Sequence, residues 1–150
     1  MIINYFLRNI SNLKINRMIS NIIKFRVRYG ETDQMSFVYY GNYAQYFEMG
    51  RVEWLRNLGI SYKKMEESGI MLPVINLNTN YLKPAKYDDL LTLETTLFKT
   101  PTAKIDFAYK IYNEDEELLA TATTTLVFIN MQNNKPTRAP KYLLKKIIQS

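Results

Sequence analysis

The organised pattern of the chain starts with alternating apolar and polar residues over 22–29. A period of two is typical of a strand that buries one face, so we predict a half-buried strand that ends before Gly30. Its buried face is expected to carry Ile23, Phe25, Val27 and Tyr29. Residues 31–40 show little periodicity and are predicted to form a loop.

Apolar residues then recur at helical spacing over residues 42–58, which predicts a long helix. Asn42 is its expected N-cap, and Gly59 is the expected stop at its C-terminal end. Apolar residues surround much of this helix, which indicates burial, and Gly50 in its middle indicates close approach by another element. The apolar stripe consists of Tyr43, Tyr46, Phe47, Gly50, Trp54 and Leu58. A short second helix is predicted over residues 61–68.

The remainder of the chain is dominated by strand patterns. We expect strands over residues 70–83 (interrupted at Pro73), 88–98, 103–112 and 118–129, and a short helix over 142–148. Short connections between successive strands favour an antiparallel sheet. The long apolar helix has only this sheet to bury it. We therefore predict an α+β domain in which a five-stranded antiparallel sheet wraps around the helix.

The net charge of +6 is unevenly distributed along the chain. Residues 1–20 carry three basic residues and residues 135–150 carry five, and neither segment has an acidic residue. Residues 21–134 carry twelve basic against fourteen acidic residues, so the body has no basic stripe. We expect no nucleic-acid partner. Binding of nucleic acid through the basic ends is the alternative, and it would depend steeply on salt.

The 150 residues, 47% of them hydrophobic, suffice for one domain with a buried core. We expect residues 1–20 to form a poorly ordered leader and residues 21–150 to form the domain. The start of the chain lacks the cleavage site of a signal peptide, and no apolar run reaches the roughly 18 residues of a membrane span. These features predict a cytoplasmic protein, with the place of residues 1–17 in the mature protein left open.

Histidine and cysteine are both absent from the sequence. Their absence excludes a Ser-His-Asp triad, a thiolate nucleophile and zinc sites built on either residue. Catalysis by this chain must then use carboxylates, hydroxyls, lysine or backbone dipoles. We expect neither a metal nor a cofactor.

The segment from Arg28 to Arg56 carries a distinctive set of residues. It includes Thr32-Asp33, Ser36, Tyr39-Tyr40, Asn42-Tyr43, Phe47-Glu48 and Arg51. This order resembles the signature of the acyl-CoA thioesterase branch of the hotdog-fold superfamily, the 4-hydroxybenzoyl-CoA thioesterase-like group. Weaker similarity continues at Leu72-Pro73, Tyr81, Pro84, Asp88 or Asp89, and from Pro136 to Pro140. The group usually has glycine where this chain has Ser36, which concerns the shape of the loop if that position needs a positive φ.

The resemblance implies a thioesterase mechanism that needs no histidine. Asp33 corresponds to the catalytic carboxylate of the group, which either attacks the thioester carbonyl or activates a water that does. Tyr40 corresponds to the residue whose backbone N–H polarises that carbonyl. A helix that begins near residue 41 presents unpaired N–H groups and a partial positive charge, which suit a developing oxyanion. The structural alternative for Asp33 is a turn residue.

The resemblance also suggests which residues contact the substrate. The acyl or pantetheine channel is expected to be lined by Phe37, Val38 and Tyr39. The phosphates of coenzyme A are expected to meet Lys83 and Arg138, with Lys86 and Lys104 as further candidates. Glu48 is a second candidate carboxylate, because a related branch places its catalytic acid on the central helix. An ion pair between Glu48 and Arg51 is the favoured alternative.

The partners implied by the resemblance are an acyl-CoA or acyl-carrier-protein thioester and further copies of the chain. Paired sheet edges would form a homodimer or homotetramer with active sites at the subunit boundary. A non-catalytic hotdog protein that binds acyl-CoA or an acyl carrier is the alternative function. A hydratase is disfavoured because the relatives with that activity depend on histidine. The acyl chain length is left open.

Overall fold

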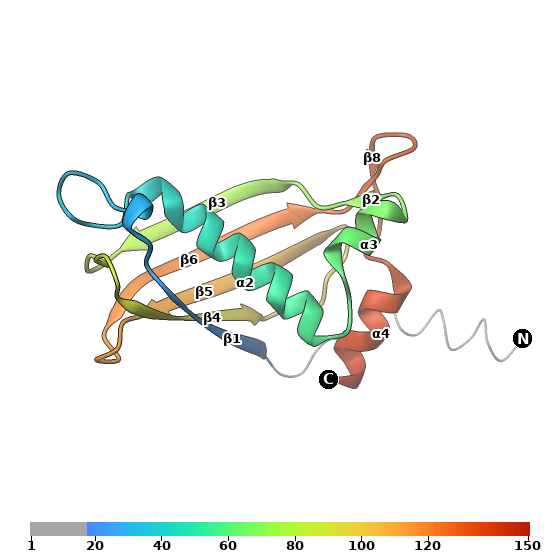
Figure 1. Cartoon of the computed structure of the whole chain (residues 1–150). Helices are drawn as coiled ribbons and strands as arrows, with labels where there is room; N and C mark the ends of the chain where they lie inside the picture. Colours follow the sequence, from blue (N-terminus) through green and yellow to red (C-terminus); the bar gives the residue numbers. More distant parts are fainter. Residues whose placement is uncertain (1–17) are drawn as a thin grey trace, which may run out of the picture.

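Five strands form one antiparallel sheet in the computed structural model, which describes residues 18–150 (Figure 1). In spatial order they are β1 (Ile19–Arg26), β4 (Leu90–Leu97), β5 (Lys104–Tyr112), β6 (Leu118–Val127) and β3 (Val74–Tyr81). The register pairs Leu93 with Ile111, and both side chains are fully buried. The antiparallel pairing of β4 with β5 confirms the arrangement predicted from the short connection between them.

The helix α2 (Tyr43–Asn57) lies across one face of this sheet (Figure 1). Its buried residues are Tyr43, Tyr46, Phe47, Gly50, Trp54 and Leu55. Trp54 packs edge-on against Phe107 of β5 with ring centroids 5.1 Å apart, and its indole N–H donates to the carbonyl of Ile19 at 3.0 Å. The sheet wrapped around one apolar helix confirms the predicted hotdog fold class.

Gly50 lies where α2 comes closest to the sheet. A Cβ atom at this position would lie 2.9 Å from Leu93 Cδ2 and would collide with the hydroxyl of Thr95. The close approach expected from a glycine in mid-helix is thus confirmed. Thr95 is buried, and its Oγ1 has no hydrogen-bond partner among the described residues.

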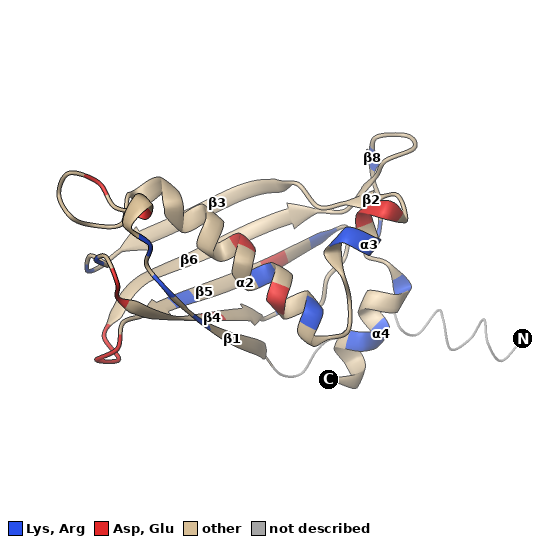
Figure 2. Cartoon of the chain, viewed as in Figure 1, with Lys and Arg blue, Asp and Glu red and all other residues tan. Residues whose placement is uncertain are grey.

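Two helices and a small sheet cover the end of the domain near the C-terminus of α2 (Figure 1). They are α3 (Tyr62–Glu67), α4 (Lys141–Gln149), β2 (Ile70–Met71), β7 (Ile129–Asn130) and β8 (Lys135–Pro136). The charged residues of α4 are all basic, as Figure 2 shows, while its Leu143, Leu144 and Ile147 are buried. Gly59 has a φ of 79°, which confirms its role as the stop of the long helix.

The first strand differs from the sequence prediction. β1 begins at Ile19 rather than residue 22, because Ile19 pairs with Leu97 at the edge of the sheet. Part of the expected leader is therefore a strand, and the expectations for residues 1–17 concern a segment outside the described residues. Tyr29, expected on the buried face, is 79% exposed because the chain has already turned into the 3-10 helix η1 (Tyr29–Glu31). Within the described chain, no helix has the length and apolar character needed to cross a membrane.

β3 is an edge strand, and β6 is its only strand partner within residues 18–150. It runs along the length of α2, from the α3 end of the domain to the end where α2 begins (Figure 1). Exposed apolar side chains on and beside it are Val74, Ile75, Leu77, Tyr81 and Leu82. An apolar edge of this kind is usually protected by pairing with another chain.

Candidate active site

Asp33 begins a tight loop that follows η1. Its N–H donates to the carbonyl of Phe37, and the N–H of Ser36 donates to the carbonyl of Asp33, both at 2.9 Å. Ser36 has a φ of 65°, the left-handed conformation that glycine adopts without strain. The serine therefore keeps the turn at a conformational cost of about 1–2 kcal/mol.

The Asp33 side chain is half-buried and takes part in this turn. One carboxylate oxygen accepts a hydrogen bond from the N–H of Met35 at 2.9 Å. The structural role considered for Asp33 is thus present in the molecule. No other hydrogen bond to this carboxylate is found within residues 18–150, so its second oxygen can engage a ligand.

The start of the central helix is anchored by Glu31. Its carbonyl accepts hydrogen bonds from Tyr39 N–H at 2.9 Å and from the side-chain amide of Asn42 at 2.8 Å. Asn42 occupies the predicted N-cap position of α2, but its side chain makes no capping hydrogen bond, because its backbone is already helical and its side-chain amide binds Glu31 instead. The buried Glu31 carboxylate accepts from Arg28 N–H at 2.8 Å and from the Tyr46 hydroxyl at 3.1 Å.

Sequence reasoning missed Glu31, although one signal was available. Glu31 stands three residues after Arg28 and closes a capping box around η1. Burial, followed by the neighbouring Glu31 carboxylate, raises the pKa of Tyr46. The loop with Asp33 and the helix start are therefore both tied to a buried polar pair.

Tyr40 begins the 3-10 helix η2 (Tyr40–Asn42), which leads directly into α2. No hydrogen bond from its backbone N–H is found within the described chain. Unpaired N–H groups are expected in the first turn of a helix, where the helix dipole also places partial positive charge. This end of the helix can therefore accept an anionic oxygen.

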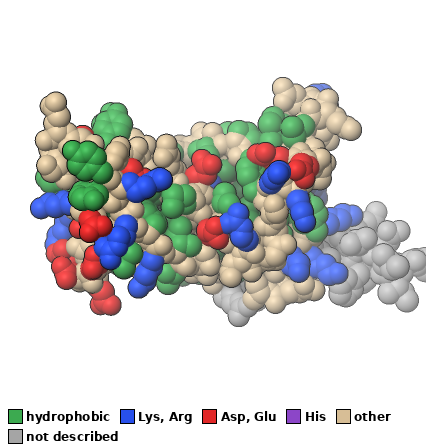
Figure 3. Space-filling model, viewed as in Figure 1, with side chains coloured by type: hydrophobic (Ala, Val, Ile, Leu, Met, Phe, Trp, Pro, Cys, Tyr) green, Lys and Arg blue, Asp and Glu red, His purple; other side chains and the backbone are tan. Residues whose placement is uncertain are grey.

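Asp33 and Tyr40 line the same cavity, whose volume is about 300 Å³. Its complete lining is Asp33, Met35, Phe37, Val38, Tyr40, Tyr43, Tyr81, Leu82, Lys83 and Pro84. Figure 3 shows exposed apolar side chains gathered at this end of the molecule. Those from the loops and the helix start are Tyr29, Met35, Tyr39, Tyr40 and Tyr87. Among the described residues, no group of three or more potential ligands is placed to hold a metal ion.

Three of the residues expected to contact the substrate occupy different places relative to the Asp33 cavity. Lys83 lines the cavity, and its ammonium group pairs with the Glu117 carboxylate, which lowers the pKa of Glu117. Tyr39 packs against Tyr40 with ring centroids 4.7 Å apart, outside the cavity lining. Arg138 follows β8, at the opposite end of the sheet from η2 (Figure 1), so a single chain does not bring it to Asp33. The lining also omits Lys86 and Lys104.

Tyr81 joins the edge strand to the helix start. Its hydroxyl donates to the carbonyl of Tyr40 at 3.2 Å, and its ring meets that of Tyr43 edge-on at 5.1 Å. In the sequence analysis, Tyr81 is only one of the weaker points of resemblance to the family. Its contact with Tyr40 depends on the meeting of segments about forty residues apart, which no local pattern reports.

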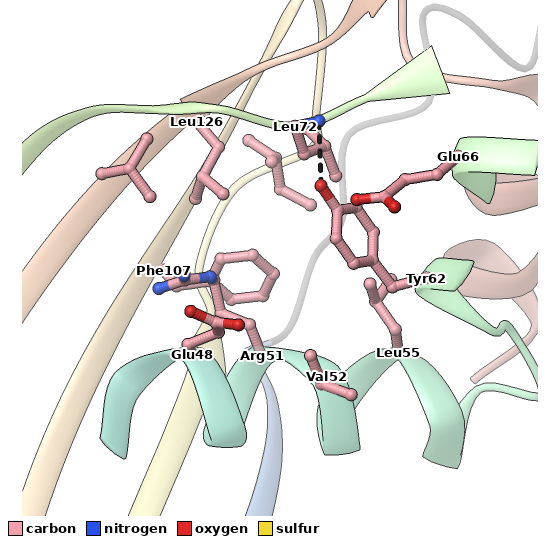
Figure 4. Close-up of a pocket in the computed structure, with 11 residues that line it drawn as sticks. Glu48, Arg51, Val52, Leu55, Tyr62, Glu66, Leu72, Phe107 and Leu126 are labelled. Carbon is pink, nitrogen blue, oxygen red and sulfur yellow. Dashed lines mark hydrogen bonds between the residues drawn. The ribbon is translucent and has the colours of Figure 1, made fainter. Parts of the chain in front are cut away.

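A second cavity of about 300 Å³ lies between α2, α3 and the sheet (Figure 4). Its apolar wall consists of Val52, Leu55, Leu72, Val74, Ile105, Phe107 and Leu126. Its polar groups are Glu48 and Arg51 from α2 and Tyr62 and Glu66 from α3. The expected ion pair between Glu48 and Arg51 is not formed in the described chain. Arg51 instead donates to the hydroxyl of Tyr109 at 3.1 Å.

The chain resembles known proteins over most of its length. Residues 27–147 match the family model described as the Thioesterase-like superfamily. YneP of Bacillus subtilis, provisionally named an acyl-CoA thioesterase, is 35% identical over 113 residues, which are 75% of this chain and 82% of that protein. The acyl-CoA thioesterase YbgC of Haemophilus influenzae is 32% identical over 127 residues, covering 83% and 93%. The solved structure of a DHNA-CoA thioesterase from Staphylococcus aureus has a TM-score of 0.81 and 36% identity, covering 87% of this chain and 91% of its own.

Proposed function

The chain belongs to the Thioesterase-like superfamily, and on that premise we propose that it hydrolyses acyl-CoA thioesters with Asp33 and the backbone of Tyr40. The products are a free carboxylic acid and the thiol of coenzyme A. The names of YneP and YbgC support acyl-CoA as the substrate class. The observation that carries the residue assignment is the single cavity lined by both Asp33 and Tyr40.

The chemistry follows from where charge develops during the reaction. The Asp33 carboxylate attacks the thioester carbon itself, or it takes a proton from a water that attacks. Either route turns the carbonyl oxygen into an oxyanion, which the free N–H of Tyr40 and the helix dipole stabilise. Collapse of the tetrahedral intermediate breaks the carbon–sulfur bond, and the coenzyme A thiolate leaves and takes up a proton. If water was the attacking group, the free acid is formed in this step. If Asp33 attacked directly, the acyl group remains on Asp33 as an anhydride, and a water molecule then hydrolyses it to the free acid and the Asp33 carboxylate.

We further propose that two copies associate through the β3 edges. The exposed apolar side chains of β3 and its free edge support this arrangement. Such a dimer would place the cavity of one chain beside the second copy, because Tyr81 of β3 lines that cavity. Sedimentation at micromolar concentration tests the association, and a stable monomer would contradict it.

The test of the chemistry compares Asp33→Asn with the unmodified chain in release of free thiol from acyl-CoA substrates. Asparagine can still accept the Met35 N–H, so the turn should survive while the carboxylate is lost. We expect kcat to fall at least about 100-fold. Asp89→Asn is the matched control, since Asp89 likewise accepts a loop N–H, from Lys86 at 2.8 Å, outside the cavity.

Two outcomes would overturn the proposal. Activity that survives Asp33→Asn unchanged would reject the site assignment. Tight acyl-CoA binding without turnover on any chain length would instead identify a non-catalytic acyl-CoA binding protein. Running the same assay with acyl-carrier-protein thioesters distinguishes the two possible carriers.

A further inference from the structure

The second cavity places a cation against an apolar wall. Arg51 is half-buried there, and Tyr109 is its only hydrogen-bond partner within residues 18–150. The hydroxyl of Tyr109 also forms a hydrogen bond with the hydroxyl of Thr124, 2.6 Å away. These two hydrogen bonds connect the guanidinium of Arg51 to the sheet. A guanidinium has five N–H donors, and leaving donors without partners beside apolar side chains is costly. The unused donors of Arg51 therefore provide a site for an oxygen atom of a ligand.

The carboxylates of the cavity restrict what that oxygen can be. Figure 4 shows Glu48 on the same side of the cavity as Arg51, and Glu66 beside Tyr62 on the opposite side. A carboxylate ligand would be repelled by both glutamates, and a plain alkyl chain would leave without a partner the N–H groups of Arg51 that do not bind Tyr109. A hydroxyl group accepts a hydrogen bond from Arg51 and donates one to Glu48, so it satisfies both.

The Asp33 cavity and the Arg51 cavity are far apart within one chain. Val74, at the start of β3, lines the Arg51 cavity, and Tyr81, at the end of β3, lines the Asp33 cavity. Seven residue steps along a strand span about 23 Å at 3.3 Å per residue. An acyl group of ordinary length that is bound at Asp33 does not cover that distance.

Antiparallel pairing of two β3 strands brings the two cavities together. Opposed residues of an antiparallel pair point to the same face, and Leu77 faces the helix while Asn78 faces away. If the two copies of β3 (Val74–Tyr81) overlap over their full length, the twofold axis passes beside one of the two central residues, Leu77 or Asn78. In the first register Tyr81 lies opposite Pro73 of the second copy, and in the other it lies opposite Ile75. Both positions adjoin Val74 of the second copy. Tyr81, which lines the Asp33 cavity, and Val74 of the second copy, which lines the Arg51 cavity, would therefore lie about 5–8 Å apart.

We propose that the Arg51 cavity of one copy receives the far end of the acyl group whose thioester is held by Asp33 of the other copy. The cavity selects acyl groups that carry a hydroxyl at that end. This inference rests on the proposed thioesterase function, and it adds a substrate class and a residue supplied by the second copy.

The experiment measures kcat/KM for pairs of acyl-CoA substrates from C4 to C10, each with and without a terminal hydroxyl. The wild-type chain should favour the hydroxylated member of at least one pair by about tenfold or more in kcat/KM. The substrate without a hydroxyl leaves the polar groups of the cavity without a hydrogen-bond partner. Arg51→Met should reduce this ratio to about one, and Arg51→Lys should restore part of it. Arg56→Met is the control on the same helix, since Arg56 pairs with Glu53 outside the cavity.

Mixed dimers then test whether Arg51 acts across the subunit boundary. Differently tagged chains with Asp33→Asn and Arg51→Met are co-expressed, and the heterodimer is purified. If the site is shared, one site of the heterodimer contains both Asp33 and Arg51, and about half of the wild-type activity on the hydroxylated substrate returns. If each site uses its own Arg51, neither site is complete and no such recovery occurs.

The outcomes separate the inference from the function on which it rests. Equal rates on both members of every pair, or an unchanged ratio in Arg51→Met, would overturn the inference and leave the thioesterase intact. Absence of recovery in the heterodimer would overturn the shared site. If the wild-type chain releases thiol from none of the acyl-CoA substrates, the function and the inference are both overturned.

Discussion

The hydroxyl of Tyr81 donates a hydrogen bond to the backbone carbonyl of Tyr40 across 3.2 Å. Tyr81 belongs to the edge strand β3, and Tyr40 begins the turn that leads into α2. The carbonyl of Tyr40 and the N–H of Gly41 share one planar peptide group, so this bond fixes the direction of a second N–H at the helix start. The edge of the sheet thereby holds the proposed oxyanion site in place.

Replacing Tyr81 by Phe should slow the reaction without weakening substrate binding. The variant keeps the ring contacts with Tyr43 and loses one hydrogen bond, worth about 0.5–1.5 kcal/mol. We expect kcat to fall by about threefold to tenfold and KM to change by less than twofold, measured by thiol release. Tyr142→Phe, on the exposed face of α4, should leave both constants unchanged. A rise in KM alone would contradict a positioning role.

Replacing Gly50 by Ala should destabilise the fold although alanine favours helices. The new methyl group collides with Thr95 and Leu93, and overpacking costs about 1–3 kcal/mol against about 1 kcal/mol gained in helix propensity. Urea denaturation should show a lower unfolding free energy. Gly30→Ala is the control, because a Cβ atom at Gly30 would have no neighbouring side chain or distant backbone within 4 Å. Adding Thr95→Ala to the Gly50→Ala chain should restore part of the lost stability. A Gly50→Ala chain as stable as wild type would show that the sheet can retreat from α2.

Replacing Ser36 by Gly should stabilise the loop that carries Asp33. The left-handed backbone of Ser36 costs about 1–2 kcal/mol, and glycine adopts this conformation without strain. Part of this gain is offset because glycine also increases the conformational entropy of the unfolded chain. We expect the unfolding free energy to rise by up to about 1 kcal/mol in urea denaturation. Ser36→Ala should give no gain, since alanine has the same steric conflict. An equal gain in both variants would mean that the hydroxyl, rather than φ, is unfavourable.

Tyr46 should make the fold sensitive to alkaline pH. Burial and the Glu31 carboxylate raise its pKa above the ordinary value of 10.0, so its neutral form is favoured in the fold. Its contribution is complete below pH 10 and is lost as the pH rises above that value, by about 1 kcal/mol per pH unit. Urea denaturation between pH 9 and pH 11 should show a smaller loss for Tyr46→Phe than for wild type. Equal losses would place the sensitivity elsewhere.

Lys83 should contribute to binding of coenzyme A rather than to chemistry. It is the one phosphate candidate that lines the Asp33 cavity in the described chain. Lys83→Met should raise KM for acyl-CoA by about threefold to tenfold with kcat maintained, and the difference should shrink at high ionic strength. Lys104→Met, outside the cavity lining, serves as the control. A larger effect from Lys104 would relocate the phosphate contact.

The predictable part of this fold is the part that burial periodicity reports. The stripe from Tyr43 to Trp54 and the alternation in β4 and β5 record which side chains leave water, so helix and strands followed directly. Periodicity does not report where the elements end, because their ends depend on contacts between distant segments. β1 starts at Ile19 because Ile19 pairs with Leu97 of β4, and the Ile19 carbonyl also accepts a hydrogen bond from Trp54 of α2. The side chain of Asn42 binds Glu31 instead of capping its own helix.

The candidate site divides in the same way. The resemblance singled out Asp33, Phe37 and Tyr40 from a short segment, and the structure places them on one cavity. The link from Tyr81 to Tyr40 joins residues 41 positions apart. The separation of Arg138 from this cavity likewise depends on the path of the chain across the whole sheet (Figure 1).

The sequence alone determined the class of chemistry and the secondary structure. A chain without histidine or cysteine restricts catalysis to carboxylates, hydroxyls, lysine or backbone dipoles, and side-chain periodicity reports burial residue by residue. Only the tertiary structure decided that Arg51 leaves Glu48 for Tyr109 and faces a second cavity, and that β3 offers a free edge between the two cavities. Those outcomes arise from packing between segments far apart in the chain, where the partner of a charge is chosen by three-dimensional proximity rather than by spacing along a helix.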